Sequence, residues 1–440
     1  MTNQETTTNN NKVVIFGLGF VGLPLALSFS LRGCEVIGVD VNESLVNDLN
    51  NGITHHLETW HNTPIQRVLA DQIAAGRFRA TTDGAAAMAE CKNVIMTVGI
   101  PVENGDHSMD HVKSCSETIA HGLKKDDLVV VRSTLVPGMT RDYILPILES
   151  ISGLKADKDF YLGYSSERIA EGKAFDEFEN MPTLVSGIDR ASREKTAELL
   201  GIVTKADLIH ASSIEVVETA KVMENISRDV NIAMVNEFAR FTKELGIDIF
   251  EVIKVANTHK RVKLLFPGPG VGGYCIPNAL HYLTPKADEL GVPLELLRRA
   301  RDINENVPAF VAGLVAKNLP VPTNQGRVAV FGLAMKDYSN DDRYSPALHV
   351  TWLLQKAGIQ VKAYDPAVPV EYDFKVDSIE EAVKDVHGII VLAKQEGIDY
   401  NNFNLFKSLM STEGKPFIVD TRNLYDRDAA EAAGLHLESL

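Results

Sequence analysis

The feature that most constrains the fold of this chain is a run of 19 residues without a charge, between Lys12 and Arg32. The run, VVIFGLGFVGLPLALSFSL, is long enough to cross a membrane as a helix. It contains three glycines and a proline, however, and neither a basic leader nor a small-residue cleavage site flanks it. We therefore predict a strand, a tight turn and a helix here, rather than a membrane span or a signal peptide.

The predicted turn, GLGFVG at 17–22, has the spacing G-x-G-x-x-G. Gly17 permits the turn, Gly19 lets a pyrophosphate approach the backbone, and Gly22 lets helix and strand pack closely. A second β-branched run ends at Asp40, whose carboxylate would bind ribose hydroxyls and repel a 2′-phosphate, which favours NAD over NADP. FAD, or a turn without a ligand, remains an alternative. The residues expected to hold the dinucleotide at the helix N-terminus are Gly17, Gly19, Phe20, Val21 and Gly22.

Composition argues against several partners. Lysine and arginine number 44 and aspartate and glutamate 59, and the net charge of −15 disfavours a nucleic acid or an anionic membrane as partner. The cysteines have no C-x-x-C spacing, so we expect neither a metal site nor a disulfide framework, and they suit a reducing cytoplasm. They are Cys34, Cys91, Cys115 and Cys275.

Hydrophobic periodicity predicts an α/β fold in both halves of the chain. Short β-branched runs alternate with helix-length segments, which is typical of a parallel sheet with crossover helices. In the first half they span 13–17, 35–40, 93–98, 128–134 and 160–167. In the second half, strands are predicted at 328–334, 361–366, 388–393 and 417–422, with a helix at 345–358.

The middle of the chain is predicted to be helical. One long helix fills 212–246, helices follow at 248–257 and 293–317, and a loop spans 258–278. The predicted architecture is two Rossmann-like, doubly wound domains joined by a central helical domain, whose long helix is the expected interface of a homodimer. Its parts are a disordered leader (1–11), a dinucleotide-binding domain (12–211), the helical domain (212–317), a linker (318–327) and the second Rossmann-like domain (328–440).

The loop FPGPGVGGYCIP at 266–277 has the clearest chemical content. Its glycines and prolines exclude a helix or strand interior, and such a backbone can approach a ligand closely. The loop presents one thiol, so we predict that Cys275 is a nucleophile. The other three cysteines are expected to be small buried hydrophobes.

Further candidates come from helix spacing and strand ends. Lys221 and Asn225 share one face of the long predicted helix, as a buried polar pair or as a solvated stripe. Thr134 and Glu167 follow two predicted strands, where parallel sheets place ligands. The second half lacks the glycine fingerprint and has FGLAMK instead, in which Lys336 indicates an anionic group held by charge or simply a solvated lysine.

Together these motifs resemble the UDP-glucose/GDP-mannose dehydrogenase family over residues 12–430. The matching segments are FGLGFVGLPLA, RSTLVPGMT, SSERIAEG, VETAKVMENISRDVNIAMVNE, GPGVGGYCIP, FGLAMK, DDRYSP and VDTRN. GPGVGGYCIP and ENISRDVNIA are most similar to the branch that acts on UDP-N-acetylhexosamines, such as UDP-N-acetylmannosamine.

The resemblance implies an NAD-dependent, four-electron oxidation of a sugar C6 alcohol to a carboxylate. Cys275 would capture the aldehyde as a thiohemiacetal, which becomes a thioester and is hydrolysed. Lys221 and Asn225 would stabilise the oxyanion, and Glu167 would move a proton through a water that Thr134 positions. The residues implied to bind the UDP-sugar are Glu167, Lys221, Asn225, Arg261, Gly272, Lys336 and Arg422, and those implied to approach NAD include Thr134 and Arg343.

The chain departs from the family pattern near the cysteine. An aspartate normally lies four residues after it, where this chain has Ala279, preceded by Asn278. Ser166, Gly99 and Tyr338 also replace the usual residues. We therefore keep open another nucleotide sugar such as UDP-glucose, a β-hydroxyacid-type dehydrogenase that needs no cysteine, and a nucleotide-sugar-binding protein without turnover.

Overall fold

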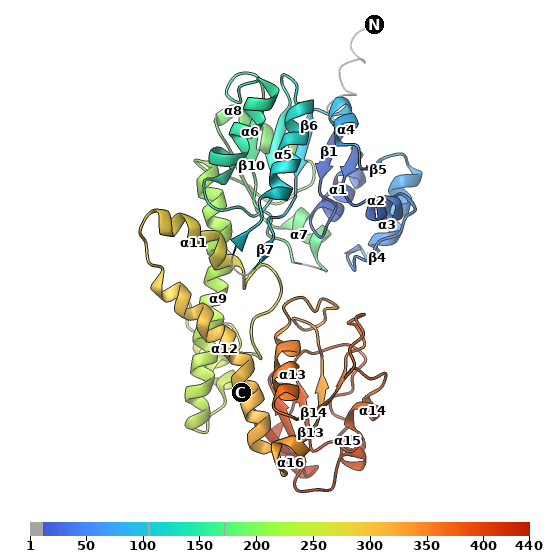
Figure 1. The fold of residues 1–440 in the computed structure, drawn as a ribbon, viewed down its shortest axis with the longest axis vertical. Helices are drawn as coiled ribbons and strands as arrows, with labels where there is room; N and C mark the ends of the chain where they lie inside the picture. The colour runs from blue at the N-terminus through green and yellow to red at the C-terminus, as the bar shows by residue number, and fades with distance from the viewer. Residues whose placement is uncertain (1–11, 104–105, 171) are drawn as a thin grey trace. The chain divides into compact units, whose positions relative to one another are not determined.

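The computed structural model describes residues 12–103, 106–170 and 172–440, so the predicted leader lies outside the described residues. The chain divides into two compact units (Figure 1). The first comprises Met1–Met223 and His281–Gly291, and the second comprises Glu224–Leu280 and Val292–Leu440. Helix α9 (Ile214–Glu244) contributes residues to both units, and confirms the long helix predicted at 212–246.

The first unit is built on an eight-stranded sheet in the order β12-β11-β10-β9-β6-β1-β2-β5. The strand order reverses between β1 and β6, which makes the carboxyl ends of these two strands a switch point where doubly wound sheets bind ligands. The strands are β1 (Lys12–Phe16), β2 (Glu35–Val39), β5 (Phe78–Thr81), β6 (Asn93–Met96), β9 (Leu128–Val131), β10 (Tyr161–Tyr164), β11 (Thr183–Gly187) and β12 (Leu208–His210).

Helices cover this sheet, and two short hairpins extend its loops. The helices are α1 (Gly22–Leu31), α2 (Glu43–Asn50), α3 (Ile65–Ala74), α4 (Gly84–Glu90), α5 (Asp110–Gly122), α6 (Leu145–Ser152) after a π-helical turn (Thr140–Ile144), α7 (Ala174–Asn180) and α8 (Arg190–Leu200). The hairpins pair β3 (Thr59–Trp60) with β4 (Thr63–Pro64) and β7 (Val102–Glu103) with β8 (Asp106–His107).

The charge-free run is β1, a turn and α1, as predicted. Helix α1 is buried along nearly its whole length, since Leu23, Leu27 and Phe29 have no exposed surface. An apolar helix therefore packs inside the core of this unit. Among the helices that the structure describes, none has the length and apolarity needed to cross a membrane.

Two strands at one edge of the large sheet, β11 and β12, run against the predicted parallel arrangement. Strand β11 pairs antiparallel with β10, while the other ladders of the large sheet are parallel. The apolar pattern of a buried strand does not encode its direction, so this reversal could not be predicted from the pattern.

The second unit combines helices with a five-stranded, all-parallel sheet in the order β14-β13-β15-β16-β17. Helices α10 (Ile249–Ala256) and α12 (Glu295–Asn318) confirm the predictions at 248–257 and 293–317. Helix α11 (Ala279–Glu289), which contains Pro285 and belongs mostly to the first unit, was not predicted. The strands are β13 (Arg327–Phe331), β14 (Gln360–Tyr364), β15 (Gly388–Val391), β16 (Phe417–Asp420) and β17 (His436–Ser439). The remaining helices are α13 (Pro346–Lys356), α14 (Ile379–Val383), α15 (Phe403–Leu409), α16 (Arg427–Ala432) and a 3-10 turn (Thr323–Gln325).

Candidate active site

The glycine turn after β1 is held by the strands beside it. The Gly17 amide donates to the Val39 carbonyl at 2.8 Å, and the Thr97 hydroxyl donates to the Gly17 carbonyl at 2.8 Å. Asp40 accepts the Leu18 amide at 2.8 Å through Oδ2 and the Asn42 amide at 3.0 Å through Oδ1. Asp40 thus lies at the end of the turn with its carboxylate half-exposed, as a ribose-binding residue must.

The turn also has the space that a dinucleotide needs. A Cβ on Gly22 would overlap the Gly17 carbonyl and come within 2.7 Å of Thr97 Oγ1, so only glycine fits there. At Gly19, by contrast, a Cβ would meet nothing within 4 Å, which leaves the backbone open to a pyrophosphate at the N-terminus of α1. The residues present therefore fit NAD.

A histidine packs beside this turn. The rings of Phe20 and His56 lie with centroids 5.1 Å apart. Burial, with a smaller contribution from His55, lowers the pKa of His56 from 6.5 to about 4, so its ring is neutral at pH 7.

Thr134 and Glu167 each lie three residues beyond the neighbouring parallel strands β9 and β10, at the same edge of the sheet. The Glu167 carboxylate is buried and forms an ion pair with the buried Arg132 guanidinium. Its other oxygen accepts the amides of Arg168 at 2.6 Å and Ile169 at 3.0 Å. The ring of Phe178 stacks 5.7 Å from the guanidinium carbon of Arg132, which fixes the cation that holds Glu167.

Helix α9 places Lys221 and Asn225 one turn apart, with 8% and 7% of their surfaces exposed, so they are a buried polar pair and not a solvated stripe. One turn earlier, the buried Glu218 accepts the Gly138 amide at 2.6 Å and the Thr140 amide at 3.0 Å. Burial raises the pKa of Glu218, although these hydrogen bonds oppose the shift. Glu218 therefore ties the loop that follows Thr134 to helix α9.

The loop that carries Cys275 packs against the segment between β13 and α13. A Cβ on Gly272 would lie 2.6 Å from Pro346 Cδ and 2.9 Å from the Tyr344 carbonyl, so the backbone needs glycine to approach this closely. The Gly273 amide donates to the Arg343 carbonyl at 3.1 Å. The Cys275 thiol is exposed, whereas Cys34, Cys91 and Cys115 are buried.

The position of the missing family aspartate is apolar and closed. Ala279 is 2% exposed, and its amide donates to the Ile276 carbonyl at 3.1 Å. The Asn278 side chain is buried and donates to the Tyr274 carbonyl at 2.9 Å. The chain therefore closes a compact turn after Cys275, with the methyl group of Ala279 where the family has a carboxylate.

The carboxyl edge of the second sheet carries the other predicted cations. Lys336 is exposed after β13, and Arg422 follows β16 and forms an ion pair with Asp337. Arg343 holds Asp341 through two hydrogen bonds of 2.9 and 2.6 Å. Burial would raise the pKa of Asp341, but these bonds outweigh it and lower the pKa.

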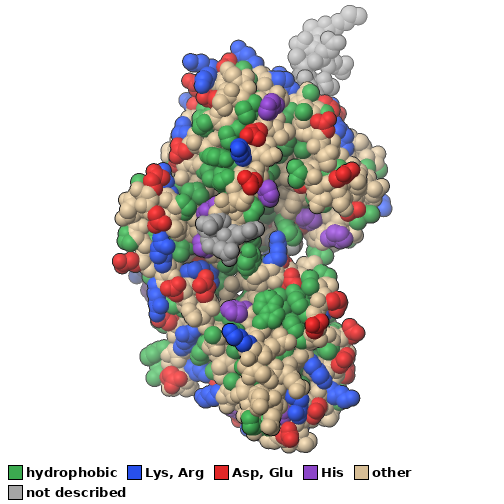
Figure 2. Space-filling view, in the orientation of Figure 1, with side chains coloured by type: hydrophobic (Ala, Val, Ile, Leu, Met, Phe, Trp, Pro, Cys, Tyr) green, Lys and Arg blue, Asp and Glu red, His purple; other side chains and the backbone are tan. Residues whose placement is uncertain are grey.

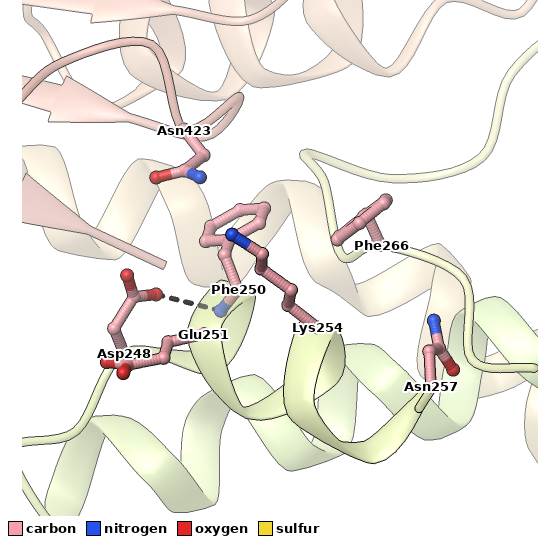
Figure 3. Close-up of a pocket in the computed structure, with 7 residues that line it drawn as sticks. All are labelled: Asp248, Phe250, Glu251, Lys254, Asn257, Phe266 and Asn423. Atoms are coloured by element: carbon pink, nitrogen blue, oxygen red, sulfur yellow. Dashed lines mark hydrogen bonds between the residues drawn. The ribbon is translucent and has the colours of Figure 1, made fainter. Parts of the chain in front are cut away.

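A cavity of about 650 Å³ in the second unit lies elsewhere (Figure 3). None of the residues predicted from the sequence lines it. Its lining residues are Asp248, Phe250, Glu251, Lys254, Asn257, Phe266 and Asn423. On the face drawn in Figure 2, acidic and basic side chains are interspersed, in keeping with the acidic composition.

The structure thus distributes the predicted residues over both units. The predicted residues of the first unit are Gly17, Gly19, Phe20, Val21, Gly22, Asp40, Thr134, Glu167 and Lys221. The predicted residues of the second unit are Asn225, Arg261, Gly272, Cys275, Lys336, Arg343 and Arg422. The sequence interpretation missed Arg132 and Glu218, and also three asparagines that contact the loop before Cys275. Asparagines in the interior of a helix are unfavourable, so Asn231 and Asn236 within α9 were a signal that could have been used.

Comparisons with known proteins agree with this architecture. The chain matches the sequence models of the NAD binding domain (residues 11–201), the central domain (215–306) and the UDP binding domain (329–427) of one family. It is 31% identical to the UDP-N-acetyl-D-mannosamine dehydrogenase of Pyrococcus horikoshii over 94% of this chain and 96% of that protein. It is also 31% identical to the UDP-N-acetyl-D-glucosamine 6-dehydrogenase of Pseudomonas aeruginosa over 96% of this chain and 98% of that protein.

Solved structures give the same result. The structure of the UDP-N-acetyl-D-mannosamine dehydrogenase from Pyrococcus horikoshii matches with a TM-score of 0.88 at 29% identity, covering 97% of this chain and 98% of that one. The Staphylococcus aureus enzyme Cap5O, a UDP-N-acetyl-mannosamine dehydrogenase, matches with a TM-score of 0.83 at 29% identity over the same shares. The first part of the chain is therefore an NAD binding domain, and the chain belongs to the UDP-glucose/GDP-mannose dehydrogenase family.

Proposed function

We propose that this NAD-dependent nucleotide-sugar dehydrogenase oxidises the C6 alcohol of a UDP-N-acetylhexosamine, of the UDP-N-acetylmannosamine type, to the uronic acid. The observation that carries the proposal is the exposed thiol of Cys275 on a glycine-rich loop, in a chain whose other three cysteines are buried. The names of the relatives from Pyrococcus and Pseudomonas support the substrate class.

NAD, when bound, accepts one hydride in each of two oxidations. In the proposed mechanism the Cys275 thiolate attacks the C6 aldehyde, and the resulting thiohemiacetal is oxidised to a thioester that water cleaves. Lys221 and Asn225 stabilise the oxygen that becomes anionic. Glu167 moves a proton through the water that Thr134 positions.

Substrate binding is assigned to cations and to the cysteine loop. We assign Lys336 and Arg422 to the diphosphate and uridine side, with Gly272 at the loop and Arg261 reaching the sugar. Arg343 is assigned to the NAD side, and its bidentate pairing with Asp341 would fix the guanidinium for that role.

The decisive experiment is a panel of UDP- and GDP-sugars with NAD, in which NADH absorbance and product mass are recorded together. We expect two NADH per sugar. The product should be about 14 mass units heavier than the substrate, because the two oxidations together replace two hydrogens by one oxygen. One NADH per sugar with a free aldehyde or ketone would exclude the uronic acid. Cys275→Ala should abolish turnover, whereas a β-hydroxyacid-type dehydrogenase would keep its activity.

Ala279 supports a second candidate, a nucleotide-sugar-binding protein without turnover. Such a protein would bind UDP-sugar and NAD in calorimetry but produce no NADH. We favour instead a site rebuilt to work without this carboxylate, since Ser166, Gly99 and Tyr338 also depart from the family pattern. Ala279→Asp should then lower turnover, and no covalent adduct on Cys275 should accumulate in the parent. Faster turnover in the variant, with an adduct in the parent, would show that hydrolysis is impaired.

We also propose that the chain forms a homodimer through the long helix in a reducing cytoplasm. Met234, Phe238, Phe241 and Leu245 recur at intervals of three and four residues along α9, and all are exposed, Phe241 to 62%. Light scattering should give twice the chain mass. Phe241→Glu should yield a monomer, and Glu237→Lys, a charge change on the same helix, should leave the dimer intact.

A further inference from the structure

The segment that leads into the cysteine loop has no helix or strand of its own, so its backbone groups need other partners. Side-chain amides supply them. Asn231 on α9 accepts the Leu265 amide at 2.9 Å and donates to the Lys263 carbonyl at 2.8 Å. Asn257, at the end of α10, accepts the Leu264 amide at 2.7 Å and donates to the Leu264 carbonyl at 3.0 Å.

A third asparagine holds the next part of the segment. Within Pro267-Gly268-Pro269 only Gly268 has an amide hydrogen, because proline has none. Gly268 donates it to Oδ1 of the buried Asn236 at 3.2 Å. This hydrogen bond therefore uses the only backbone N–H donor of these three residues.

Asn236 is oriented by a buried polar chain that joins α9 to α12. Its amide nitrogen donates to Asn304 at 3.2 Å, and Asn304 donates to the Asp229 carboxylate at 2.8 Å. Arg301 neutralises this carboxylate at 2.8 Å. All four residues are at most 6% exposed. Every amide therefore has its oxygen and nitrogen assigned, and Asn236 must present its oxygen to Gly268.

The segment is packed on its other sides as well. Phe266 stacks on Phe250 of α10 with ring centroids 6.0 Å apart, beside the cavity of Figure 3. A Cβ on Gly268 would lie 2.9 Å from the guanidinium of Arg422. The fixed backbone therefore borders Arg422 and leads, seven residues later, to Cys275.

We infer that Asn231, Asn236 and Asn257 are positioning residues, which hold the 263–268 segment so that the loop presents Cys275 in one place. The buried chain of Asp229, Arg301 and Asn304 serves this role by fixing Asn236. The expected effect on catalysis rests on the proposed function, whereas the expected effect on the position of the loop does not.

Two variants and one control test the inference. Asn236→Ala removes the buried fixed point, and Asn231→Ala removes a half-buried one without leaving a charge unpaired. The control is Asn50→Ala, because Asn50 closes the same two-point contact on Ala80, at 2.9 and 2.8 Å, in the first unit. Unfolding midpoints for all three show how much each variant is destabilised.

Hydrogen exchange of peptides over 263–275 and the alkylation rate of Cys275, followed by intact mass, report on the loop without turnover. The buried positions of the other cysteines make this thiol the preferred target. Both rates should rise in Asn231→Ala and Asn236→Ala and stay unchanged in Asn50→Ala. The kcat for the UDP-sugar should fall, by on the order of 10²-fold for Asn236→Ala, since small misplacement of a reacting group has this cost. KM for NAD should not change.

Exchange and alkylation at the rates of the parent in both loop variants would overturn the inference. So would faster exchange with an unchanged kcat, because the contacts would then be structural only. If the parent oxidises no nucleotide sugar in the panel, the proposed function fails, while exchange and alkylation still decide whether the asparagines hold the cysteine loop.

Discussion

The turns that follow β1 and β13 begin alike and end differently. Gly17 and Gly332 each donate their amide to the last residue of the neighbouring strand, Val39 or Tyr364. In each sheet an aspartate just beyond that strand accepts the next amide of the turn. For Asp40 the donor is Leu18 at 2.8 Å, and for Asp365 it is Leu333 at 2.7 Å.

The difference lies in what remains free. Asp40 accepts two backbone amides and is half-exposed, so it retains lone pairs for a ribose. Asp365 is 2% exposed and accepts five N–H donors, from Leu333, Ala334, Ala367, Val368 and Gln395. In both sheets the aspartate thus links the turn after one strand to the end of the neighbouring strand. Only an aspartate that is accessible and has free lone pairs can also bind a ligand.

The continuation of each turn shows two ways to attract phosphate. Helix α1 begins at Gly22, directly after the first turn, and offers backbone amides and a helix N-terminus. In the second sheet α13 begins only at Pro346, and the intervening segment carries the charged side chains of Lys336 and Arg343. Under the proposed function, we therefore expect the first site to depend on close backbone approach and the second on charge.

The strongest test of this contrast adds one methyl group to the first turn and removes one from the second. Gly22→Ala should weaken NAD binding on the order of 10²-fold, because the new Cβ would overlap the Gly17 carbonyl and displace the backbone from the pyrophosphate. Calorimetry with NAD measures the loss. Ala334→Gly, at the position of the second turn that matches Gly19 of the first, should leave the affinity for UDP-sugar within a few-fold. Equal sensitivity at both positions would contradict the contrast.

Removing a charge should have the opposite pattern. Lys336→Ala is expected to raise KM for the UDP-sugar by about 10- to 100-fold, the range for loss of a charged hydrogen bond, and to leave KM for NAD unchanged. Lys362→Ala, a lysine on β14 that donates to a backbone carbonyl, is the matched control. An unchanged KM for the UDP-sugar would assign Lys336 to the solvated surface.

A smaller effect is expected at Asp40. Asp40→Asn keeps one acceptor for the turn but removes the charge that repels a 2′-phosphate, so the preference for NAD over NADP should fall about tenfold. The ratio of kcat/KM for the two cofactors measures it. Asp365→Asn should lower the unfolding midpoint and leave this ratio as it is. A parent enzyme that uses both cofactors equally would refute the role of Asp40.

The smallest expected effect is a loss of stability in acid, at the histidine beside the first turn. The folded pKa of His56 is about 4 and its ordinary value is 6.5, so the unfolded chain binds the extra proton first, and stability is lost as pH falls through this window. The loss is at most about 3 kcal/mol. The His56→Gln variant should therefore have nearly the same unfolding midpoint at pH 7 and at pH 5, measured for the transition in which the first unit unfolds. As the control, His111→Gln, at an exposed histidine of the first unit, should retain the pH dependence of the parent.

Local sequence determines the elements that could be predicted. The glycine spacing and Asp40 belong to one strand–turn–helix–strand unit, and the contacts found between Gly17, Leu18, Val39 and Asp40 are those that this unit requires. The buried run of α1 and the length of α9 follow from patterns of the same range. The roles of Cys275, Lys221 and Glu167 remain predictions, since they came from motifs and not from contacts.

The missed features depend on residues far apart in the chain. Arg132 meets Glu167 across 35 positions, and Asn236 meets Asn304 across 68. No local pattern distinguishes an asparagine that will hold a distant backbone from one that faces solvent. Helix α11 was not predicted, and it contains Pro285 in its interior, where proline removes a helix hydrogen bond and local sequence therefore disfavours a helix.

The distribution of the four thiols makes this chain suited to spectroscopy without engineering. Burial raises the pKa of Cys34 and raises that of Cys91 to about 11, so these groups are both hidden and protonated at neutral pH. A nitroxide or fluorophore added to the native protein should attach at Cys275 alone. Each copy then carries one probe, and a dimer carries a symmetric pair. Pulsed electron resonance on such a sample would give one distance between the two labelled loops.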